Sequence, residues 1–281
     1  MLVEECCHHL FRSLLPDIDP KHEGVAFDVG VGTFSFYCET FAKLGYRTIA
    51  VEPIPTDELK QICKRQGVKL FESVLGGVDD TVTLYIGSYE GAENTNLSSL
   101  NSDWWGRSTR TKQVSSMTLP TLLAEVKANK ITCMKIDVEG SEQTILSQFP
   151  VLPQSQIPSV VMFEYGGGGQ RQEQVGAWSE EYLASTKACL AILKQCGFED
   201  SIVIEAASSQ ERLVNLRETS LTESEFFGPE DIYGNIIAFR EFHPSRQKIA
   251  DICRQYASNN PAHQNPFTKL LKLTRRLYER R

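Results

Sequence analysis

Short apolar runs alternate with helical patterns along most of this 281-residue chain, and no other property of the sequence narrows the possible folds as far. The run VAFDVG at residues 25–30 ends in Asp and Gly, as expected of a parallel strand buried on both faces. Such strands alternating with helices predict a mostly parallel sheet covered by helices. We expect further strands at 47–53, 68–74, 131–140, 159–165, 201–206 and 231–242, and helices at 35–45, 56–67, 118–129, 141–149 and 178–198.

The middle of the chain departs from this rhythm. Residues 81–88 alternate as a half-exposed strand does, and the stretch after them is polar. An inserted strand followed by a loop is therefore predicted at 81–117. We expect a main domain at 24–243, preceded by an N-terminal helical cap at 1–23. A C-terminal helical basic tail is expected at 244–281. Its basic stretch from Thr268 is interpreted as a solvated helix, and a contact for an acidic partner or a membrane surface is the alternative.

The charge balance counts against nucleic acid as the main partner. Lys and Arg total 29 against 36 Asp and Glu, which gives a net charge of −7 and no global field that attracts a polyanion. The eight cysteines show no C-x-x-C spacing, which excludes a zinc ribbon. The sequence shows neither a signal peptide nor a membrane-spanning apolar stretch, so we expect a cytoplasmic protein with reduced thiols.

Acidic residues close several of the predicted strands. In an open α/β sheet, ligands bind beside the carboxyl ends of the strands. A carboxylate buried without a partner costs free energy, so acids at several strand ends imply a cation, hydroxyl donors or a water-filled cleft. The residues at the strand ends are Asp28, Gly30, Glu52, Ser73, Asp137, Glu139 and Glu164.

The segment DVGVG, residues 28–32, suits a nucleotide cofactor because it lies between a predicted strand and a predicted helix. Gly30 and Gly32 let the backbone approach a ligand, and the N–H groups of the helix then face it. Glu52 closes the next strand, where a carboxylate can accept both hydroxyls of a ribose. Together these residues predict an adenosine cofactor; the alternative is a tight turn beside a solvated glutamate.

The charge at the strand ends favours a cationic cofactor over a dinucleotide. The third glycine of G-x-G-x-x-G is missing, since Ser35 stands in its place. Asp28, Asp137 and Glu139 would also face the negative pyrophosphate of a dinucleotide in a partly desolvated cleft. S-adenosylmethionine carries a sulfonium and an ammonium group, which acids at the strand ends would accommodate.

Four segments, FDVGVG, VEPIP, MKIDVEGSE and VMFEY, together resemble the FkbM-type S-adenosylmethionine-dependent methyltransferases over about residues 24–240. The resemblance implies a class I, Rossmann-like methyltransferase fold, α/β in class, with a seven-stranded mostly parallel sheet, an antiparallel last strand and helices on both faces. It also implies O-methylation of a hydroxyl on a sugar or glycosylated small molecule. The chain departs from the family's D-V-G-A-N-x-G at residues 31, 32 and 34, and from its T-L-D at residue 120.

Methyl transfer is an in-line displacement, so the protein must align the acceptor atom, the methyl group and the sulfur, and must accept the acceptor's proton. On the donor side we assign Glu52 to the ribose. We assign Asp28, with the backbone of Gly30 and Gly32, to the methionine end, and Ser73 with Val74 to the adenine edge.

Asp137 is the predicted proton acceptor, with Glu139 and Glu164 beside it, because crowded carboxylates raise one another's pKa. One alternative is that Asp137 only orients the cofactor or holds a water. His243, after the last predicted strand, is the alternative base. The three acids could instead bind a hard divalent ion, which prefers oxygen ligands. Their spacing does not decide this, and no metal is predicted.

The acceptor side is predicted from composition. Asn94, Ser98, Ser99 and Trp104 lie in the insertion, and hydroxyl, amide and aromatic groups suit a carbohydrate-containing small molecule. Surface packing of Trp104 and Trp105 is the alternative. The glycine run at 166–169 indicates either a lid hinge or a turn.

Three other functions are compatible with the sequence. They are N-methylation of an amide or amine on a peptide or metabolite, a nicotinamide-dependent oxidoreductase, and a binding module that keeps the cofactor pocket without turnover. The oligomeric state is not predicted.

Overall fold

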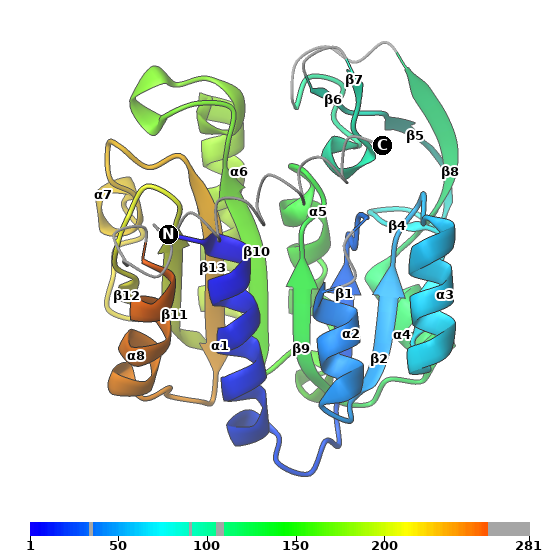
Figure 1. Ribbon diagram of the computed structural model, residues 1–281, viewed down its shortest axis with the longest axis horizontal. Helices are drawn as coiled ribbons and strands as arrows, with labels where there is room; N and C mark the ends of the chain where they lie inside the picture. Colours follow the sequence, from blue (N-terminus) through cyan, green and yellow to red (C-terminus); the bar gives the residue numbers. More distant parts are fainter. Residues whose placement is uncertain (34–35, 90–91, 105–109, 258–281) are drawn as a thin grey trace, which may run out of the picture.

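The computed structural model describes residues 1–33, 36–89, 92–104 and 110–257. Its centre is an eight-stranded sheet in the order β12-β11-β13-β10-β9-β1-β2-β3 (Figure 1). The order reverses between β1 and β9, and an α/β sheet binds its ligand at such a switch point. The strands are β1 Val25–Val29, β2 Arg47–Val51, β3 Lys69–Phe71, β9 Ile131–Ile136, β10 Val160–Gly166, β11 Phe198–Glu205, β12 Arg212–Asn215 and β13 Tyr233–Arg240.

The strand directions confirm the predicted class and correct the strand number. β1, β2, β3, β9 and β10 pair in parallel, and the last strand, β13, lies between β10 and β11, antiparallel to both. The prediction of seven strands is wrong by one, because β12 pairs antiparallel with β11 at the edge of the sheet. Its sequence, RLVN, is short and half polar, so it does not stand out from a loop; its pairing covers an edge of β11 that would otherwise be open.

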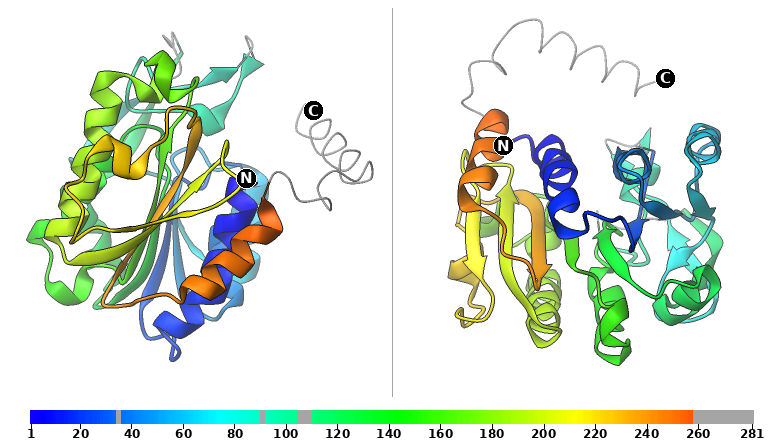
Figure 2. Two further views of the ribbon diagram at one scale, coloured as in Figure 1. Left: turned by 90° about the vertical axis from the view of Figure 1, so that its left-hand side faces the viewer. Right: turned by 90° about the horizontal axis from the view of Figure 1, so that it is seen from below.

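Helices cover both faces of the sheet, as predicted (Figure 2). On one face, α1, α2 and α8 share a buried apolar cluster with the sheet, and α3 packs on α2. On the other face, α4, α5 and α6 share the larger cluster. The helices are α1 Val3–Ile18, α2 Phe36–Lys43, α3 Asp57–Gln66, α4 Leu119–Val126, α5 Glu142–Leu146, α6 Glu180–Gln195, α7 Glu223–Phe226 and α8 Arg246–Tyr256.

A second, three-stranded sheet rises above the carboxyl ends of β1 and β2 (Figure 1). In it, β8 (Thr111–Met117) pairs in parallel with β4 (Val74–Leu75) and antiparallel with β5 (Asp80–Tyr85). Between β5 and β8 come β6 (Ser88–Tyr89), β7 (Ala92–Glu93) and the short 3-10 helix η1 (Thr95–Leu97). This sheet places the loop that carries η1 directly over the switch point.

Local signals in the sequence explain both ends of α3. The side chain of Thr56 accepts a hydrogen bond from the backbone N–H of Leu59 and caps α3, and Gly67 ends the helix in the left-handed conformation. The remaining 3-10 helices are η2 Phe149–Val151, η3 Gln154–Gln156, η4 Arg171–Glu173 and η5 Gly176–Trp178. Within the described ranges, no helix is both long and apolar enough to span a bilayer.

Some sequence predictions fall on residues that the structure does not describe. They concern Ser35, Trp105 and the basic part of the tail at 258–281.

Candidate active site

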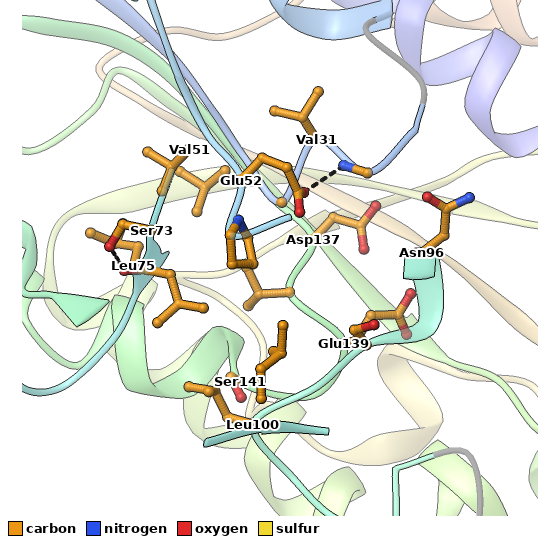
Figure 3. Close-up of a pocket in the computed structure, with 18 of the residues that line it drawn as sticks. Val31, Val51, Glu52, Ser73, Leu75, Asn96, Leu100, Asp137, Glu139 and Ser141 are labelled. Atoms are coloured by element: carbon orange, nitrogen blue, oxygen red, sulfur yellow. Dashed lines mark hydrogen bonds between the residues drawn. The ribbon is translucent and has the colours of Figure 1, made fainter. Parts of the chain in front are cut away.

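A cavity of about 160 Å³ lies at the carboxyl edge of the sheet, beside the switch point (Figure 3). It joins the ends of β1, β2 and β9 to the loop that carries η1. In Figure 3, Ser73 and Leu75 lie on one side, and Asn96, Asp137 and Glu139 on the other. Of the predicted cofactor and catalytic residues, the cavity brings together Gly30, Gly32, Glu52, Ser73, Val74, Asp137 and Glu139.

Glu52 is held at the end of β2 by two backbone donors. Its Oε2 accepts from the N–H of Gly32 at 2.8 Å, and its Oε1 accepts from the N–H of Ile54 at 3.0 Å. Burial raises the pKa of this carboxyl, although the two N–H groups oppose the shift. A carboxylate oxygen has two lone pairs, so each oxygen can still accept a hydroxyl proton from a ligand. The geometry suits the predicted contact with a ribose.

Gly30, directly after β1, lies close to the backbone that follows β9. Its φ is +73°, and a Cβ atom there would lie 1.7 Å from the backbone oxygen of Asp137. Only glycine meets both conditions without displacing the backbone. The glycine therefore fixes the distance between the two strand ends that line the cavity.

The wall opposite the acids is mostly apolar. Val74, Leu75, Leu84 and Leu100 line it. The hydroxyl of Ser73 donates to the backbone oxygens of Val74 and Ser115, both at 2.9 Å, and thereby ties β3 to the second sheet. Apolar side chains of this kind suit the predicted adenine.

Asp28, predicted to hold the methionine end of the cofactor, lies beneath the cavity and is 1% exposed. Its Oδ2 accepts from the N–H of Cys38 at 2.8 Å and so fixes the first turns of α2. Burial raises the pKa of this carboxyl, and the neighbouring Lys135 opposes the shift. Asp28 does not line the cavity, so its direct contact with a cofactor stays a prediction.

Lys135 is a residue of the site that the sequence analysis missed. It is 3% exposed, and its ammonium group lies 3.4 Å from both Asp28 Oδ1 and Asp137 Oδ2. A lysine inside the otherwise apolar run ITCMKI was the available signal, because a buried ammonium group needs partners. The acids at the strand ends are therefore partly neutralised by the protein itself.

Asp137 and Glu139 line the cavity, whereas Glu164 lies close to both and lines a small neighbouring cavity. Each offers a carboxylate oxygen within 4.8 Å of the other two. The pKa of Glu164 is raised well above its usual value, first by burial and then by the charges of Asp137 and Glu139. Burial and the two neighbouring charges therefore disfavour the charged form of the Glu164 carboxyl. Oxygen donors this close also suit a divalent cation, so metal binding stays an alternative to proton transfer.

The predicted acceptor residues separate in the structure. Ser98 lines the cavity, and so does Thr95, which was not predicted. Asn94 caps η1 by accepting from the backbone N–H of Asn96 at 3.1 Å. Ser99 donates from its hydroxyl to the backbone oxygen of Glu139 at 2.6 Å. These contacts shape the loop, and the Ser98 hydroxyl accepts from the backbone N–H of Gly87 at 3.3 Å.

Trp104 is buried at 8% exposure and supports the carboxylates instead of offering a free face for stacking. Its indole N–H donates to Glu139 Oε2, and its ring packs edge-on against Tyr182. A Cβ atom at Gly140 would lie 2.4 Å from the Trp104 ring, so the glycine of the DVEG segment makes room for it. Trp104 thus fixes the direction of Glu139.

His243, the alternative base, lies away from this site. It follows β13, and because β13 is antiparallel, its carboxyl end reaches the opposite edge of the sheet. Its side chain is 70% exposed and its Nδ1 pairs with Asp200 at 2.6 Å. That prediction is wrong because an antiparallel strand ends at the other side of the molecule.

The strand order, the antiparallel strand β13 between β10 and β11 and the cavity at the switch point are those of a class I methyltransferase. The chain belongs to the FkbM methyltransferase family, since residues 22–199 match the methyltransferase FkbM domain. It is an S-adenosylmethionine-dependent methyltransferase, and the resemblance inferred from the four sequence segments is confirmed. The match ends at residue 199, whereas the resemblance was expected to reach about residue 240.

Two solved structures show similarity to the chain. The magnesium protoporphyrin IX methyltransferase of Synechocystis PCC 6803, with bound S-adenosylhomocysteine, is 11% identical, and the similarity covers 85% of each chain with a TM-score of 0.37. The geranyl diphosphate C-methyltransferase of Streptomyces coelicolor A3(2) is 11% identical, with 83% of this chain and 80% of that chain covered and a TM-score of 0.37. No curated protein matches the chain in sequence.

Proposed function

We propose that the cavity binds S-adenosylmethionine and that the protein transfers the methyl group to a hydroxyl of a sugar or glycosylated small molecule. One observation carries the proposal: the glycine turn, Glu52, Ser73 and Asp137, far apart in sequence, line one cavity beside the switch point. In this arrangement Glu52 accepts the ribose hydroxyls, and the apolar wall at Val74 takes the adenine. The methionine end points to Gly30 and Asp137.

The three carboxylates suit the release of a hydroxyl proton. When a hydroxyl attacks the methyl group, its proton must leave, and a carboxylate within hydrogen-bond reach can accept it. Asp137 adjoins both the donor cavity and the pair formed by Glu139 and Glu164. We assign Asp137 as the base, with Glu139 and Glu164 beside it.

A polar roof supports a hydroxylated acceptor. Thr95, Asn96 and Ser98 line the cavity from the loop that carries η1. Asn96 lies on the same side as Asp137 and Glu139 (Figure 3). Hydroxyl and amide groups can both donate and accept hydrogen bonds, as recognition of a sugar requires. The same groups would bind an amine less specifically, which places N-methylation second.

Donor binding is tested by calorimetric titration with S-adenosylhomocysteine. Glu52→Gln should weaken binding by about 10- to 100-fold, because a hydrogen bond to a charged group contributes about 1.5–3 kcal/mol. Glu72→Gln is the matched control: Glu72 is exposed and pairs with Lys60 outside the cavity. Binding of NAD, with no response to the homocysteine compound, would refute the proposal.

The acceptor class is tested by incubating the protein and S-adenosylmethionine with a panel of saccharides, glycosides and amines. The products are then measured by mass spectrometry. We expect a mass increase of one methyl group on a hydroxylated compound. Asp137→Asn should lower turnover by about 10²- to 10⁴-fold, the usual contribution of a general base. Methylation confined to amines would overturn the hydroxyl assignment. Unchanged turnover in the Asn variant would overturn the base assignment.

A further inference from the structure

A buried cation stands directly behind the donor cavity. Lys135 belongs to β9, the central strand beside β1, and its side chain is 4% exposed. Its neighbours in the strand are fully buried, so the ammonium group has no route to bulk water along the strand. A buried ammonium group persists only when polar or negative partners replace its hydration shell.

Those partners belong to the site. The Nζ atom donates to the backbone oxygen of Gly30 and lies 3.4 Å from carboxylate oxygens of both Asp28 and Asp137. It also lies 5.7 Å from the centre of the Tyr37 ring, on its face. One ammonium group thus joins the first strand, the central strand and α2.

The same network reaches the N-terminal helix. The hydroxyl of Tyr37 donates to Glu4 Oε2 at 3.0 Å, and Asn235 donates to Glu4 Oε1 at 2.8 Å. Glu4 and Asn235 both lie outside the matched family domain. The position of Tyr37, and through it of Lys135, is therefore fixed from α1 and β13 as well.

We infer that Lys135 is a positioning residue of the donor site. It holds the Gly30 carbonyl and the Asp137 carboxylate, which line the cavity, in one fixed arrangement, and its charge offsets part of theirs. The inference rests on the proposed binding of S-adenosylmethionine in this cavity. Lys135 lies behind Gly30 and Asp137, so it acts on the ligand through them.

The charge of Lys135 gives the inference a specific consequence. S-adenosylmethionine carries a net charge of +1 through its sulfonium, whereas S-adenosylhomocysteine is neutral overall. Removing a positive charge behind the cavity leaves the site more negative, which favours the cation over the neutral product. A defect that is only structural would weaken both ligands equally.

The test compares Lys135→Met, Asp28→Asn and the double variant Lys135→Met/Asp28→Asn by calorimetric titration with both ligands. Thermal unfolding of each protein checks its fold. The double variant removes one positive and one negative charge, so it leaves no uncompensated buried carboxylate at residue 28 if the single lysine variant fails to fold. Lys130→Met is the matched control, because Lys130 precedes the same strand, is 46% exposed and pairs with Asp19 and Glu23.

We expect Lys135→Met to weaken the binding of S-adenosylhomocysteine by about tenfold or more, the usual effect of losing a charged hydrogen bond. The preference for S-adenosylmethionine over the product should rise by about threefold or more. In the double variant the preference should return toward that of the parent while the affinity stays low relative to Asp28→Asn, since the positioning contacts are still missing. Lys130→Met should bind as the parent does.

Two results would overturn the inference. One is a double variant that binds S-adenosylhomocysteine within about threefold of Asp28→Asn, a change smaller than one hydrogen bond contributes. The other is an equal weakening of both ligands by Lys135→Met, which would make the lysine a structural residue only. If the parent protein binds neither ligand, the proposed function fails instead, so the two failures are distinguishable.

Discussion

Gly30 sets the spacing of the donor site at the scale of single residues. We expect Gly30→Ala to destabilise the protein by more than about 3 kcal/mol, because strain at positive φ adds to a clash with the backbone of Asp137. Gly67 is the matched control: its φ is +70°, and nothing lies within 4 Å of a Cβ atom there. Gly67→Ala should therefore cost only about 1 kcal/mol.

Urea unfolding of both alanine variants separates the two costs. The difference between their free energies of unfolding measures the clash, because the conformational cost is common to both. Equal losses in the two variants would show that the strands can separate at Gly30. The tight approach would then not be what fixes the cavity.

Strand-end residues could be predicted from the sequence, but their roles within the site could not. Gly30, Glu52 and Asp137 follow apolar runs, and they do line one cavity. Asp28 also ends such a run, yet it lies beneath the cavity. In a strand buried on both faces, no polar alternation shows which side chain points to the ligand. The role of Lys135 could not be predicted for the same reason, because its partners come from other strands.

Among the elements, η1 forms the roof of the cavity and is tied to the glycine turn by one side chain. Asn96 accepts from the backbone N–H of Thr33 at 2.8 Å and donates to the Thr33 hydroxyl at 2.9 Å. Asn96→Ala should weaken S-adenosylhomocysteine by about 3- to 10-fold in calorimetry, the effect of one or two exposed hydrogen bonds. The unfolding midpoint should hardly change.

Gln113→Ala is the control for the roof. Gln113 also makes an exposed hydrogen bond, to Thr83 at 2.9 Å, but it joins β8 to β5. Gln113→Ala should therefore leave the affinity for S-adenosylhomocysteine unchanged. Equal affinities for the parent and the Asn96 variant would show that the roof does not hold the donor.

The N-terminal helix α1 contributes to the core, although the sequence presents it as a cap. Leu10 is fully buried in the cluster that α1 shares with α2, α8 and the sheet. Leu10→Ala should lower the free energy of unfolding by about 2–4 kcal/mol, the cost of a large-to-small change in a core. Arg12→Ala, at an exposed position of the same helix, should change it by less than about 0.5 kcal/mol.

Chemical denaturation followed by circular dichroism measures both α1 variants. A Leu10 variant as stable as the Arg12 variant would mean that α1 is dispensable to the domain. Because Glu4 lies on α1, that outcome would also mean that Glu4 does not help to fix the network around Lys135.

Elements with their own local signals were predictable, and those made by pairing were not. The helix at Asp57–Gln66 has an N-cap threonine and a closing glycine, and its ends agree with the prediction. By contrast, β8 and β12 carry several polar residues. β8 falls within the predicted loop of the insertion, and no strand is predicted at β12. Each becomes a strand because a neighbouring strand offers an unpaired edge, and that edge belongs to a distant part of the chain.

Over the whole molecule, the acidic groups with raised pKa values gather near the carboxyl edge of the sheet. Burial is the first cause of the raised pKa at Glu4, Glu52, Glu142 and Glu164, and the charge of a nearby acid adds to it. A carboxyl whose pKa is higher in the folded than in the unfolded protein holds a proton that the unfolded chain releases. Its contribution to stability is complete at low pH and is lost as the pH rises through the folded pKa.

Glu142 gives this effect a measurable window. Burial, with the charge of Asp137, raises its pKa from 4.5 to about 7, although its Oε1 accepts from the backbone N–H groups of Val138 and Gly140. The parent should therefore lose on the order of 3 kcal/mol of stability through this group between pH 4.5 and 7.

Glu142→Gln keeps an oxygen for both N–H groups and cannot titrate. Urea unfolding at pH 5 and pH 8 should show a smaller loss in this variant than in the parent. Glu180→Gln, exposed in the first turn of α6, should keep the parent's pH dependence. A Glu142 variant that loses as much stability as the parent would place the titrating group elsewhere at the carboxyl edge.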